Sequence, residues 1–481
     1  MVALTDMVDY TIEQNVAVIT INNPPVNALS HGVRQGLLDS VEKALGESAV
    51  EGMVIICTGR TFIAGADISE FSRAPQEPGL HQVLSAMDNS TKPIVAAIHG
   101  TALGGGLETA LCCNYRVAVA DARFGLPEVS LGLLPGAGGT QRLPRVVGVN
   151  KALQMVTSGV PISALEALKE GLVDMIADKD LRADAILFAK TKIAGTNSHP
   201  RVRDNDDKLQ SARDNPQVFS DIRKTIARKT RGFVAPEYNI RCIEAAVSQP
   251  FDEGMKTEGK LFLELMSGPQ SAAQQYFFFS ERLAGKVPGI DKSTETLPIV
   301  KVGVIGGGLM GGGIAMNMAN VGIPVTIVET SQEALDRGLG TIRKNYENTA
   351  KKGRLRAEDV ETRCGLITGA LDIAALSDCD LIIEAVFENM AVKKEIFSRL
   401  DAIAKPEAIL ASNTSALDLN EIANTTSRPE SVIGLHFFSP ANVMRLLEVV
   451  RGEKTANSVI KTCMAFAKKI KKVGVLVGVC P

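Results

Sequence analysis

The segment 299–329 limits the fold of this chain more than any other feature of the sequence. An apolar run at 300–305 leads into Gly306-x-Gly308-x-x-Gly311, which opens a helical stretch. A second apolar run at 323–329 then ends on Glu329, eighteen residues after Gly311. Strand, glycine loop, helix, strand and acid in this order predict a doubly wound parallel α/β domain, because the helix must cross over between two neighbouring strands.

The same loop has the chemistry of a dinucleotide site. Its glycines let the backbone approach a pyrophosphate, which the positive end of the following helix attracts. An acid at the end of the second strand binds ribose hydroxyls and repels a 2′-phosphate, so NAD is expected rather than NADP. The alternative is a glycine-rich turn that serves packing alone, and the complete strand–helix–acid unit disfavours it. The expected NAD contacts are Gly306, Gly308, Leu309, Met310, Gly311 and Glu329.

Further apolar runs at 381–385, 408–411, 431–435, 447–450 and 473–477 extend this domain, which is expected over 296–481. His436 is the only histidine after residue 300 and follows one predicted strand, whereas Glu448 lies at a later one. Oxidation of an alcohol requires a base at the hydroxyl, and a carboxylate such as Glu448 would hold the other imidazole nitrogen. By spacing alone, a structural histidine is the simpler interpretation.

Residues 1–194 form another unit in which strands alternate with helices. Apolar runs at 16–21, 52–57 and 94–98 predict strands, and the spacing at 35–45 and 151–158 predicts helices. This alternation indicates a layered α/β domain. The next segment, 195–295, begins with the polar stretch 196–214 and continues with helical spacing from 216 to 283, so we expect a linker and a small helical module there.

Glycine-rich segments and two glutamates mark a candidate site in the first domain. The segments are FIAGAD at 62–67, HGTALGGGLE at 99–108, FGLPEVSLG at 124–132 and LPGAGGT at 134–140. Two glycine-flanked turns can each aim a backbone N–H at a thioester oxygen that becomes an enolate. Hydration of a conjugated double bond needs water at C3 and a proton at C2, which suits Glu108 and Glu128 as a coupled pair. Surface acids and packing turns are the alternative that spacing alone leaves open.

These segments closely resemble the crotonase (enoyl-CoA hydratase/isomerase) family over about 10–190. The resemblance implies a CoA thioester substrate and an oxyanion hole formed by the N–H groups of Ala64 and Gly105. It implies that Glu128 protonates C2 and that Glu108 holds and activates water. Retention of Glu128 also fits the isomerisation of a Δ3 to a Δ2 double bond, which moves a proton between C2 and C4.

The last part of the chain resembles the 3-hydroxyacyl-CoA dehydrogenase family, in EAVFENMAVKKEIF, SNTSALDLNEIA and GLHFFSPANVMRLLEVV. This resemblance implies that His436 is the catalytic base and Glu448 its partner. It implies that Ser415 binds the substrate oxygen and that Glu388 and Lys393 contact NAD. The family also has an asparagine in a GFxxNR-like segment and a helical C-terminal region. The chain stops at Cys480-Pro481, before both, so oxidation of the product is expected only in the full-length protein.

The order of the parts is similar to that of the multifunctional β-oxidation enzymes, both the peroxisomal type 1 enzymes and their bacterial counterparts. The expected fold is therefore α/β, with an N-terminal crotonase domain (a ββα spiral), a helical linker module and a C-terminal Rossmann domain. Expected substrates are acyl-CoA thioesters. The expected location is the cytoplasm in a bacterium or the peroxisomal matrix in a eukaryote. The rival interpretations are a non-catalytic binding module, an isomerase that hydrates poorly, and an oxidoreductase with a degenerate first domain.

Composition narrows the class of partner. With 45% hydrophobic residues, 22% charged residues and a formal net charge of −2, the chain has no general attraction for nucleic acid or anionic membranes. No charge-free apolar run reaches the length of about 18 residues that suggests a membrane span. The eight cysteines and five histidines show no metal-ligand spacing, so no metal is expected. We expect a monomer without an obligate protein partner.

Overall fold

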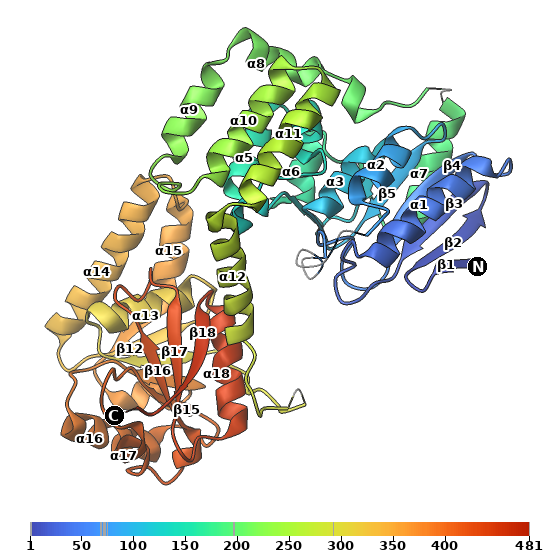
Figure 1. The fold of residues 1–481 in the computed structure, drawn as a ribbon. Helices are drawn as coiled ribbons and strands as arrows, with labels where there is room; N and C mark the ends of the chain where they lie inside the picture. The colour runs from blue at the N-terminus through green and yellow to red at the C-terminus, as the bar shows by residue number, and fades with distance from the viewer. Residues whose placement is uncertain are drawn as a thin grey trace. The chain divides into compact units, whose positions relative to one another are not determined.

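The computed structural model describes residues 2–67, 70, 74, 76–195, 198–291 and 293–480. The chain divides into two compact units, Met1–Phe278 and Phe279–Pro481 (Figure 1). Helix α12 (Pro269–Ala284) spans the division. Because each unit has its own sheet and its own apolar core, each is described by itself.

A seven-stranded sheet forms the centre of the first unit, in the order β1-β2-β3-β4-β5-β7-β10. Neighbouring strands are antiparallel from β1 to β3 and parallel from β3 onward. The strands are β1 (Val2–Thr5), β2 (Val8–Glu13), β3 (Val16–Ile21), β4 (Gly52–Cys57), β5 (Ile94–Ile98), β7 (Tyr115–Ala118) and β10 (Met175–Ile176). The structure confirms the predicted strands at 16–21, 52–57 and 94–98.

Helices cover both faces of this sheet, so its central strands are apolar along their whole length. Every residue of β4 and β5 is buried. Val54 and Val95 face a core shared with Ala185 of α7, whereas Ile55 and Ala96 face the larger core on the other side. Parallel strands that are covered on both faces are expected to be continuously hydrophobic. The helices are α1 (His31–Gly46), α2 (Leu80–Asp88), α3 (Gly105–Cys112), α4 (Gly139–Val147), α5 (Val149–Ser158), α6 (Ala164–Glu170) and α7 (Leu181–Gly195).

A second, three-stranded sheet of β6 (Thr101–Leu103), β8 (Arg123–Gly125) and β9 (Ile162–Ser163) lies beside the N-terminus of α3. β6 and β8 are parallel, and β8 and β9 are antiparallel. The turns that follow β6 and β8 lead to Gly105 and toward Glu128. This small sheet therefore brings together two of the segments that the sequence singled out.

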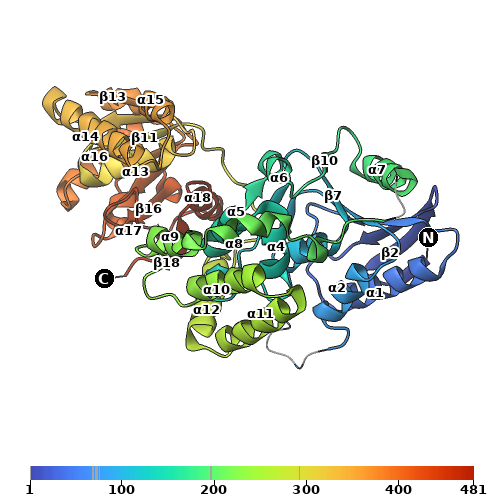
Figure 2. The same ribbon diagram turned by 90° about the horizontal axis from the view of Figure 1, so that it is seen from above.

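The helices after residue 198 pack onto the first unit. They are α8 (Gln210–Asp214), α9 (Gln217–Ile226), α10 (Ala235–Ser248) and α11 (Phe251–Met266), and no strand occurs among the described residues of this stretch. Ile240 and Ile243 of α10 belong to the same core as Leu143 of α4 and Leu153 of α5. Figure 2 shows α10 and α11 side by side, and both contact α4. The helical segment predicted at 195–295 thus shares much of its packing with the first domain.

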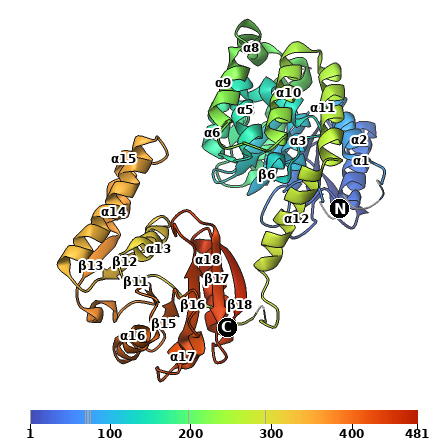
Figure 3. The ribbon, with the colours of Figure 1, turned by 60° about the vertical axis from the view of Figure 1, so that its left-hand side comes forward.

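An eight-stranded sheet forms the second unit, in the order β13-β12-β11-β14-β15-β16-β17-β18 (Figure 3). All neighbours are parallel except β16 and β17. The strands are β11 (Val302–Ile305), β12 (Val325–Val328), β13 (Ile367–Ala370), β14 (Leu381–Glu384), β15 (Ile409–Ser412), β16 (Val432–Phe437), β17 (Leu446–Arg451) and β18 (Val473–Gly478). The strand order reverses between β11 and β14, and ligands of doubly wound sheets bind at such a switch point. This confirms the predicted Rossmann architecture.

The helices of the second unit connect these strands. They are α13 (Leu309–Ala319), α14 (Gln332–Lys351), α15 (Ala357–Gly365), α16 (Met390–Ile403), α17 (Leu419–Ala423) and α18 (Asn457–Lys469). All eight cysteines are free thiols. Throughout the described ranges, no helix combines the length and apolar character needed to cross a bilayer. Those ranges also hold no group of three or more metal-ligating side chains.

Candidate functional site

Glu108 is held by backbone N–H groups at a helix end. It lies in the first turn of α3 and is only 3% exposed. Its Oε1 accepts hydrogen bonds from the N–H of Ala137 at 2.7 Å and of Gly139 at 2.9 Å. Burial raises the pKa of Glu108 above its usual value, although these two bonds and the nearby Arg142 oppose the rise. The two N–H donors hold the carboxyl group in one position and offset part of the cost of ionising it.

Glu128 lies in different surroundings. It begins a short 3-10 helix (Glu128–Leu131), and its Oε2 is buried without a hydrogen-bond partner among the described residues. Its Oε1 lies against the turn before α3, because a Cβ on Gly104 would be 2.9 Å away. Burial and repulsion from Glu108 raise the pKa of Glu128 well above its usual range. A buried carboxyl that has one oxygen without a donor among the described residues, and that lies beside a second buried acid, favours its protonated form.

Backbone N–H groups beside these acids belong to two turns. The N–H of Ala64, expected in the oxyanion hole, donates to the carbonyl of Val26 at 3.1 Å. The nitrogen of Ala66 lies next to Gly105, since a Cβ on Gly105 would be 3.6 Å from it. Neither the N–H of Ala66 nor that of Gly105 donates to another residue in the described part of the chain. The available pair is therefore Ala66 and Gly105.

Sequence reasoning did not single out two further parts of this region. Arg142 and Asp88 form a buried ion pair, and Arg142 Nη1 donates to the carbonyl of Ala137 at 3.2 Å. The second part is Glu258 of α11, which is fully buried and accepts the N–H of Gly138 in the loop before α4. Glu258 occupies the apolar face of its helix, between Gly254 and Leu261, and this position was the only sequence signal for it.

The glycine loop of the second unit follows β11 and ends at α13. Gly306 has a φ of +97°, and a Cβ on Gly311 would lie only 1.8 Å from the carbonyl oxygen of Gly306. Helix and loop can approach this closely only because residue 311 is glycine. A Cβ on Gly308, by contrast, would meet no atom within 4 Å. The loop is thus open at Gly308, at the start of α13, where a helix N-terminus can receive the pyrophosphate of NAD.

The other motif residues line or support this loop. Leu309 is exposed at the first position of α13, and Met310 packs partly against the core. Glu329 follows β12, and its Oε1 accepts the N–H of Gly307 at 2.6 Å. The acid expected to bind ribose hydroxyls therefore also holds the glycine loop in place.

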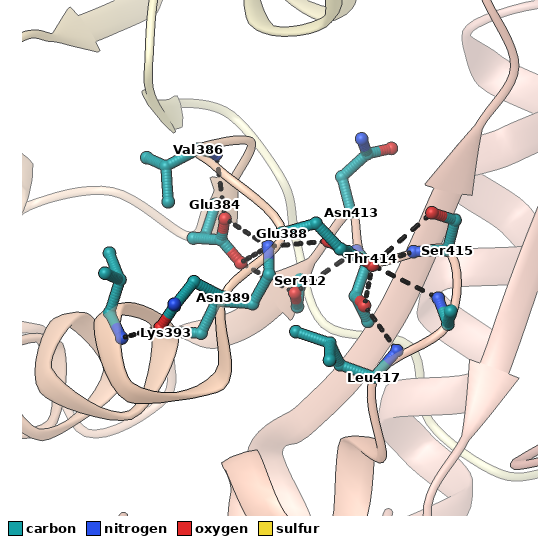
Figure 4. Close-up of polar contacts among 12 residues, drawn as sticks. Glu384, Val386, Glu388, Asn389, Lys393, Ser412, Asn413, Thr414, Ser415 and Leu417 are labelled. Carbon is teal, nitrogen blue, oxygen red and sulfur yellow. Dashed lines mark hydrogen bonds and ion pairs between the residues drawn. The ribbon is translucent and has the colours of Figure 1, made fainter. Parts of the chain in front are cut away.

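A buried ion pair lies beyond the end of β14 (Figure 4). Lys393 of α16 is 1% exposed, and its Nζ donates to both oxygens of Glu384 at 2.7 and 2.9 Å. Glu384 also accepts Ser412 Oγ at 2.7 Å and the N–H of Val386 at 2.8 Å. Lys393, expected to contact NAD, thus makes its closest contacts with Glu384, the first residue of the EAVFE motif.

Glu388 holds the segment 414–416. Its Oε1 accepts Thr414 Oγ1 at 2.6 Å and the N–H groups of Ser415 at 2.8 Å and Ala416 at 3.1 Å. Lys393 Nζ lies 3.4 Å from its Oε2. Burial would raise the pKa of Glu388, but these donors bring it below its usual value. The side chain of Ser415, which is exposed, reaches the same oxygen at 3.3 Å.

His436 and Glu448 face each other across the antiparallel strands β16 and β17. They are direct cross-strand partners, and His436 Nδ1 lies 2.8 Å from Glu448 Oε2. The ring of His436 also contacts that of Phe438, with centroids 4.5 Å apart. This arrangement holds the imidazole by one nitrogen and leaves Nε2 for another partner.

Comparison with known proteins identifies a domain family for each unit. The family model of enoyl-CoA hydratase/isomerase matches residues 11–217, and that of the 3-hydroxyacyl-CoA dehydrogenase NAD binding domain matches residues 301–480. The chain is 42% identical to the peroxisomal bifunctional enzyme of Danio rerio, over 98% of this chain and 65% of that protein. It is 38% identical to the peroxisomal fatty acid beta-oxidation multifunctional protein of Oryza sativa, over 97% of this chain and 65% of that protein.

The chain thus spans just under two thirds of the length of these relatives. Among solved structures, the dehydrogenase part of multifunctional enzyme 1 from C. elegans is 36% identical, with a TM-score of 0.39, over 43% of this chain and 48% of that one. The first unit thus carries an enoyl-CoA hydratase/isomerase domain, and the second is the NAD binding domain of a 3-hydroxyacyl-CoA dehydrogenase.

Proposed function

We propose that the first unit hydrates trans-2-enoyl-CoA to 3-hydroxyacyl-CoA. The observation that carries this proposal is the contrast between two neighbouring acids. Glu108 accepts hydrogen bonds from two N–H groups, whereas Glu128 has a buried oxygen without a partner among the described residues. A site that must take one proton and give another needs this division of roles.

In the proposed reaction Glu108 takes a proton from water as the water oxygen bonds to C3. The C2–C3 double bond breaks, and C2 receives the proton of Glu128. The negative charge that develops on the thioester oxygen is stabilised by two N–H groups. We assign these to Gly105 and Ala66, because the N–H of Ala64 already donates to Val26.

The same site supports isomerisation of a Δ3 to a Δ2 double bond. A proton leaves C2 and another is delivered to C4, with the thioester oxygen again carrying the charge. Glu128 is the carrier in this proposal, and no water adds. Hydration therefore requires both acids, whereas isomerisation requires only Glu128.

We further propose that the second unit serves the NAD-dependent oxidation of 3-hydroxyacyl-CoA. Bound NAD supplies the hydride acceptor. His436 takes the hydroxyl proton through Nε2, and Glu448 holds Nδ1 so that the ring stays oriented. Ser415 binds the substrate oxygen, and Glu388 of the loop beyond β14 and Lys393 of α16 contact the cofactor. Glu329 binds the ribose from the loop after β12.

The proposed division of labour follows the predicted domains, with hydration in 1–194, a helical module in 195–295 and NAD binding in 296–481. We place the protein in the peroxisomal matrix, which the names of its relatives support. Acyl-CoA thioesters are its proposed substrates, and it acts as a monomer.

Three assays test these proposals. Loss of the absorbance of crotonyl-CoA measures hydration, and calorimetric titration measures NAD binding in the absence of substrate. Wild-type protein that leaves crotonyl-CoA unchanged would refute the first proposal. In the full-length protein, NADH absorbance after addition of 3-hydroxyacyl-CoA and NAD compares wild type with His436→Gln, in which the base is lost and oxidation should be abolished.

A further inference from the structure

Glu258 is a buried carboxylate that the proposed reaction does not use. It lies on α11, in the helical segment that follows the hydratase/isomerase domain, and its exposure is 0%. Its Oε1 accepts the N–H of Gly138 at 2.7 Å, and its Oε2 accepts the N–H of Thr140 at 3.1 Å. Thr140 Oγ1 donates a third bond to Oε2. Full burial of an ionised carboxylate is costly unless hydrogen-bond donors such as these compensate for the loss of water.

The segment 137–140, which donates to Glu258, also donates to Glu108. Along the segment 137–140, the first and third N–H groups donate to Glu108, while the second and fourth donate to Glu258. The segment, which leads into α4, is thereby fixed between two carboxylates from different elements. If one carboxylate moves or is removed, the segment shifts, and the N–H groups that donate to the other carboxylate shift with it.

Close packing makes α11 the support of this segment. A Cβ on Gly136 would lie 2.5 Å from the ring of Phe262, and a Cβ on Gly138 would lie 3.2 Å from Met255 Sδ. A Cβ on Gly254 would in turn lie 2.2 Å from Gln141 Oε1. Three successive turns of α11 therefore touch the loop that carries the donors to Glu108.

We infer that Glu258 is a positioning residue of the hydratase site, which holds the segment 137–140 so that its N–H groups keep Glu108 in place to activate water. This inference rests on the proposed hydratase activity. It assigns part of the hydration step to the helical segment after the hydratase/isomerase domain. The hydrogen-bonded contact reaches Glu108 and not Glu128, because neither oxygen of Glu128 accepts a hydrogen bond from the segment among the described residues.

The charges around Glu258 come from several elements. Glu108 of α3 and Glu128 of the short 3-10 helix repel it, Arg142 of α4 attracts it, and Cys242 of α10 faces it as a neutral thiol. Burial and repulsion from Glu108 raise the pKa of Glu258 to about 8, against the lowering effect of Thr140, Gly138 and Arg142. Glu258→Gln therefore tests the hydrogen bonds to the segment 137–140. It also removes the repulsion of Glu258 from Glu108 and Glu128.

The experiment compares hydration with isomerisation in the full chain. Glu258→Gln keeps one acceptor oxygen, and Glu258→Ala keeps none. Misplacement of a catalytic group by about 1 Å costs on the order of 10²-fold in rate. We expect kcat for hydration of crotonyl-CoA to fall about 10-fold in the Gln variant and about 100-fold in the Ala variant, with KM nearly unchanged. Isomerisation of a trans-3-enoyl-CoA should change far less, because it uses Glu128 alone.

Glu264→Gln is the matched control, since Glu264 is an exposed acid on the same helix. It removes one carboxylate without touching the segment and should keep both rates. If Glu258→Ala does not fold, Thr140→Val removes one bond to Glu258 and should shift the ratio in the same direction, about threefold.

Equal losses of hydration and isomerisation would overturn the inference, because Glu258 would then support the fold alone. Wild-type rates of hydration in a folded Glu258→Ala variant would overturn it as well. Wild-type protein that hydrates nothing would instead count against the proposed function.

Discussion

Glu108 and Glu128 have the same side chain but opposite surroundings, and this difference predicts two kinds of variant. Glu108→Gln removes the acceptor of a water proton and should reduce hydration by about 10²–10⁴-fold while isomerisation persists. Glu128→Gln removes the proton donor of hydration and the proton carrier of isomerisation, and it should reduce both to a similar extent. Parallel assays with crotonyl-CoA and a trans-3-enoyl-CoA measure this, with Glu264→Gln as the control. Isomerisation that survives in Glu128→Gln would contradict the assignment.

The buried Glu258 also predicts how the stability of the protein depends on pH. Burial and repulsion from Glu108 raise its pKa in the folded state to about 8, from an ordinary value of 4.5. Between these values the folded chain holds more protons than the unfolded chain, so stability is present at low pH and is lost as pH rises toward 8. In Glu258→Gln the free energy of unfolding should fall less steeply from about pH 5 to about pH 8. Urea unfolding across this range gives the two slopes, and equal slopes would contradict the prediction.

At Gly308 a single side chain should separate cofactor binding from folding. A Cβ there would meet no atom within 4 Å, so Gly308→Val is tolerated by the chain but fills the proposed place of the pyrophosphate. We expect NAD affinity to fall at least about 100-fold, which corresponds to about 2.7 kcal/mol. Calorimetric titration measures the affinity. Gly340→Val, at an exposed and equally open glycine of α14, is the control and should bind NAD normally.

Sequence reasoning reached some of these residues and missed others for a physical reason. Glu108 and Glu128 stand in glycine-rich segments whose composition is unusual, so their pairing was expected, although their roles remain predictions. Glu258 reaches the same loop from 120 residues further along the chain, and nothing local marks its bonds to Gly138. The expected donor Ala64 also illustrates the limit, because a motif cannot reveal that the N–H of Ala64 already donates to Val26.

Elements were predicted best where burial is uniform. The central strands β3, β4 and β5 have the predicted bounds, because long apolar runs between helices leave no other interpretation. Strand β13 was missed: its central residues Thr368 and Gly369 are exposed at the edge of the sheet, so its sequence ITGA lacks an apolar run. Edge strands depend on pairing with a neighbour, here β12, which a local pattern does not show.

The close contact between the glycine loop and α13 predicts that two alanine substitutions differ in their cost to stability. In Gly311→Ala the new Cβ would lie 1.8 Å from the carbonyl oxygen of Gly306, so helix and loop must separate. Overpacking of this kind costs about 1–3 kcal/mol. Gly308→Ala, three residues earlier, meets open space at a φ of −67° and should cost at most about 1 kcal/mol. Urea unfolding of both variants measures the difference, and equal stabilities would show that the loop does not need its close approach to the helix.

At the scale of the molecule, the helices after residue 198 were recognised as helices, but their partner was not. Their apolar faces indicate burial without indicating which core they join. In the structure Ile240, Ile243 and Val247 complete the core of the first unit, and Glu258 reaches its loop 137–140. Long-range packing of this kind depends on the shape of a surface that the linear sequence does not describe.

The proposed residues of each site lie within one unit, so hydration and NAD binding should respond separately to mutation. Glu108, Glu128 and Glu258 share the first unit, and the glycine loop, Glu329 and His436 share the second. We expect Glu128→Gln to bind NAD with wild-type affinity although hydration is lost, and Gly308→Val to hydrate crotonyl-CoA normally although NAD binding is lost. Mutations that share no contacts act independently, so the double variant should lose as much hydration as Glu128→Gln and as much NAD affinity as Gly308→Val. The measurement is hydration rate and NAD affinity for all four proteins. A Gly308→Val variant with impaired hydration would show that the state of the cofactor site influences the hydratase site.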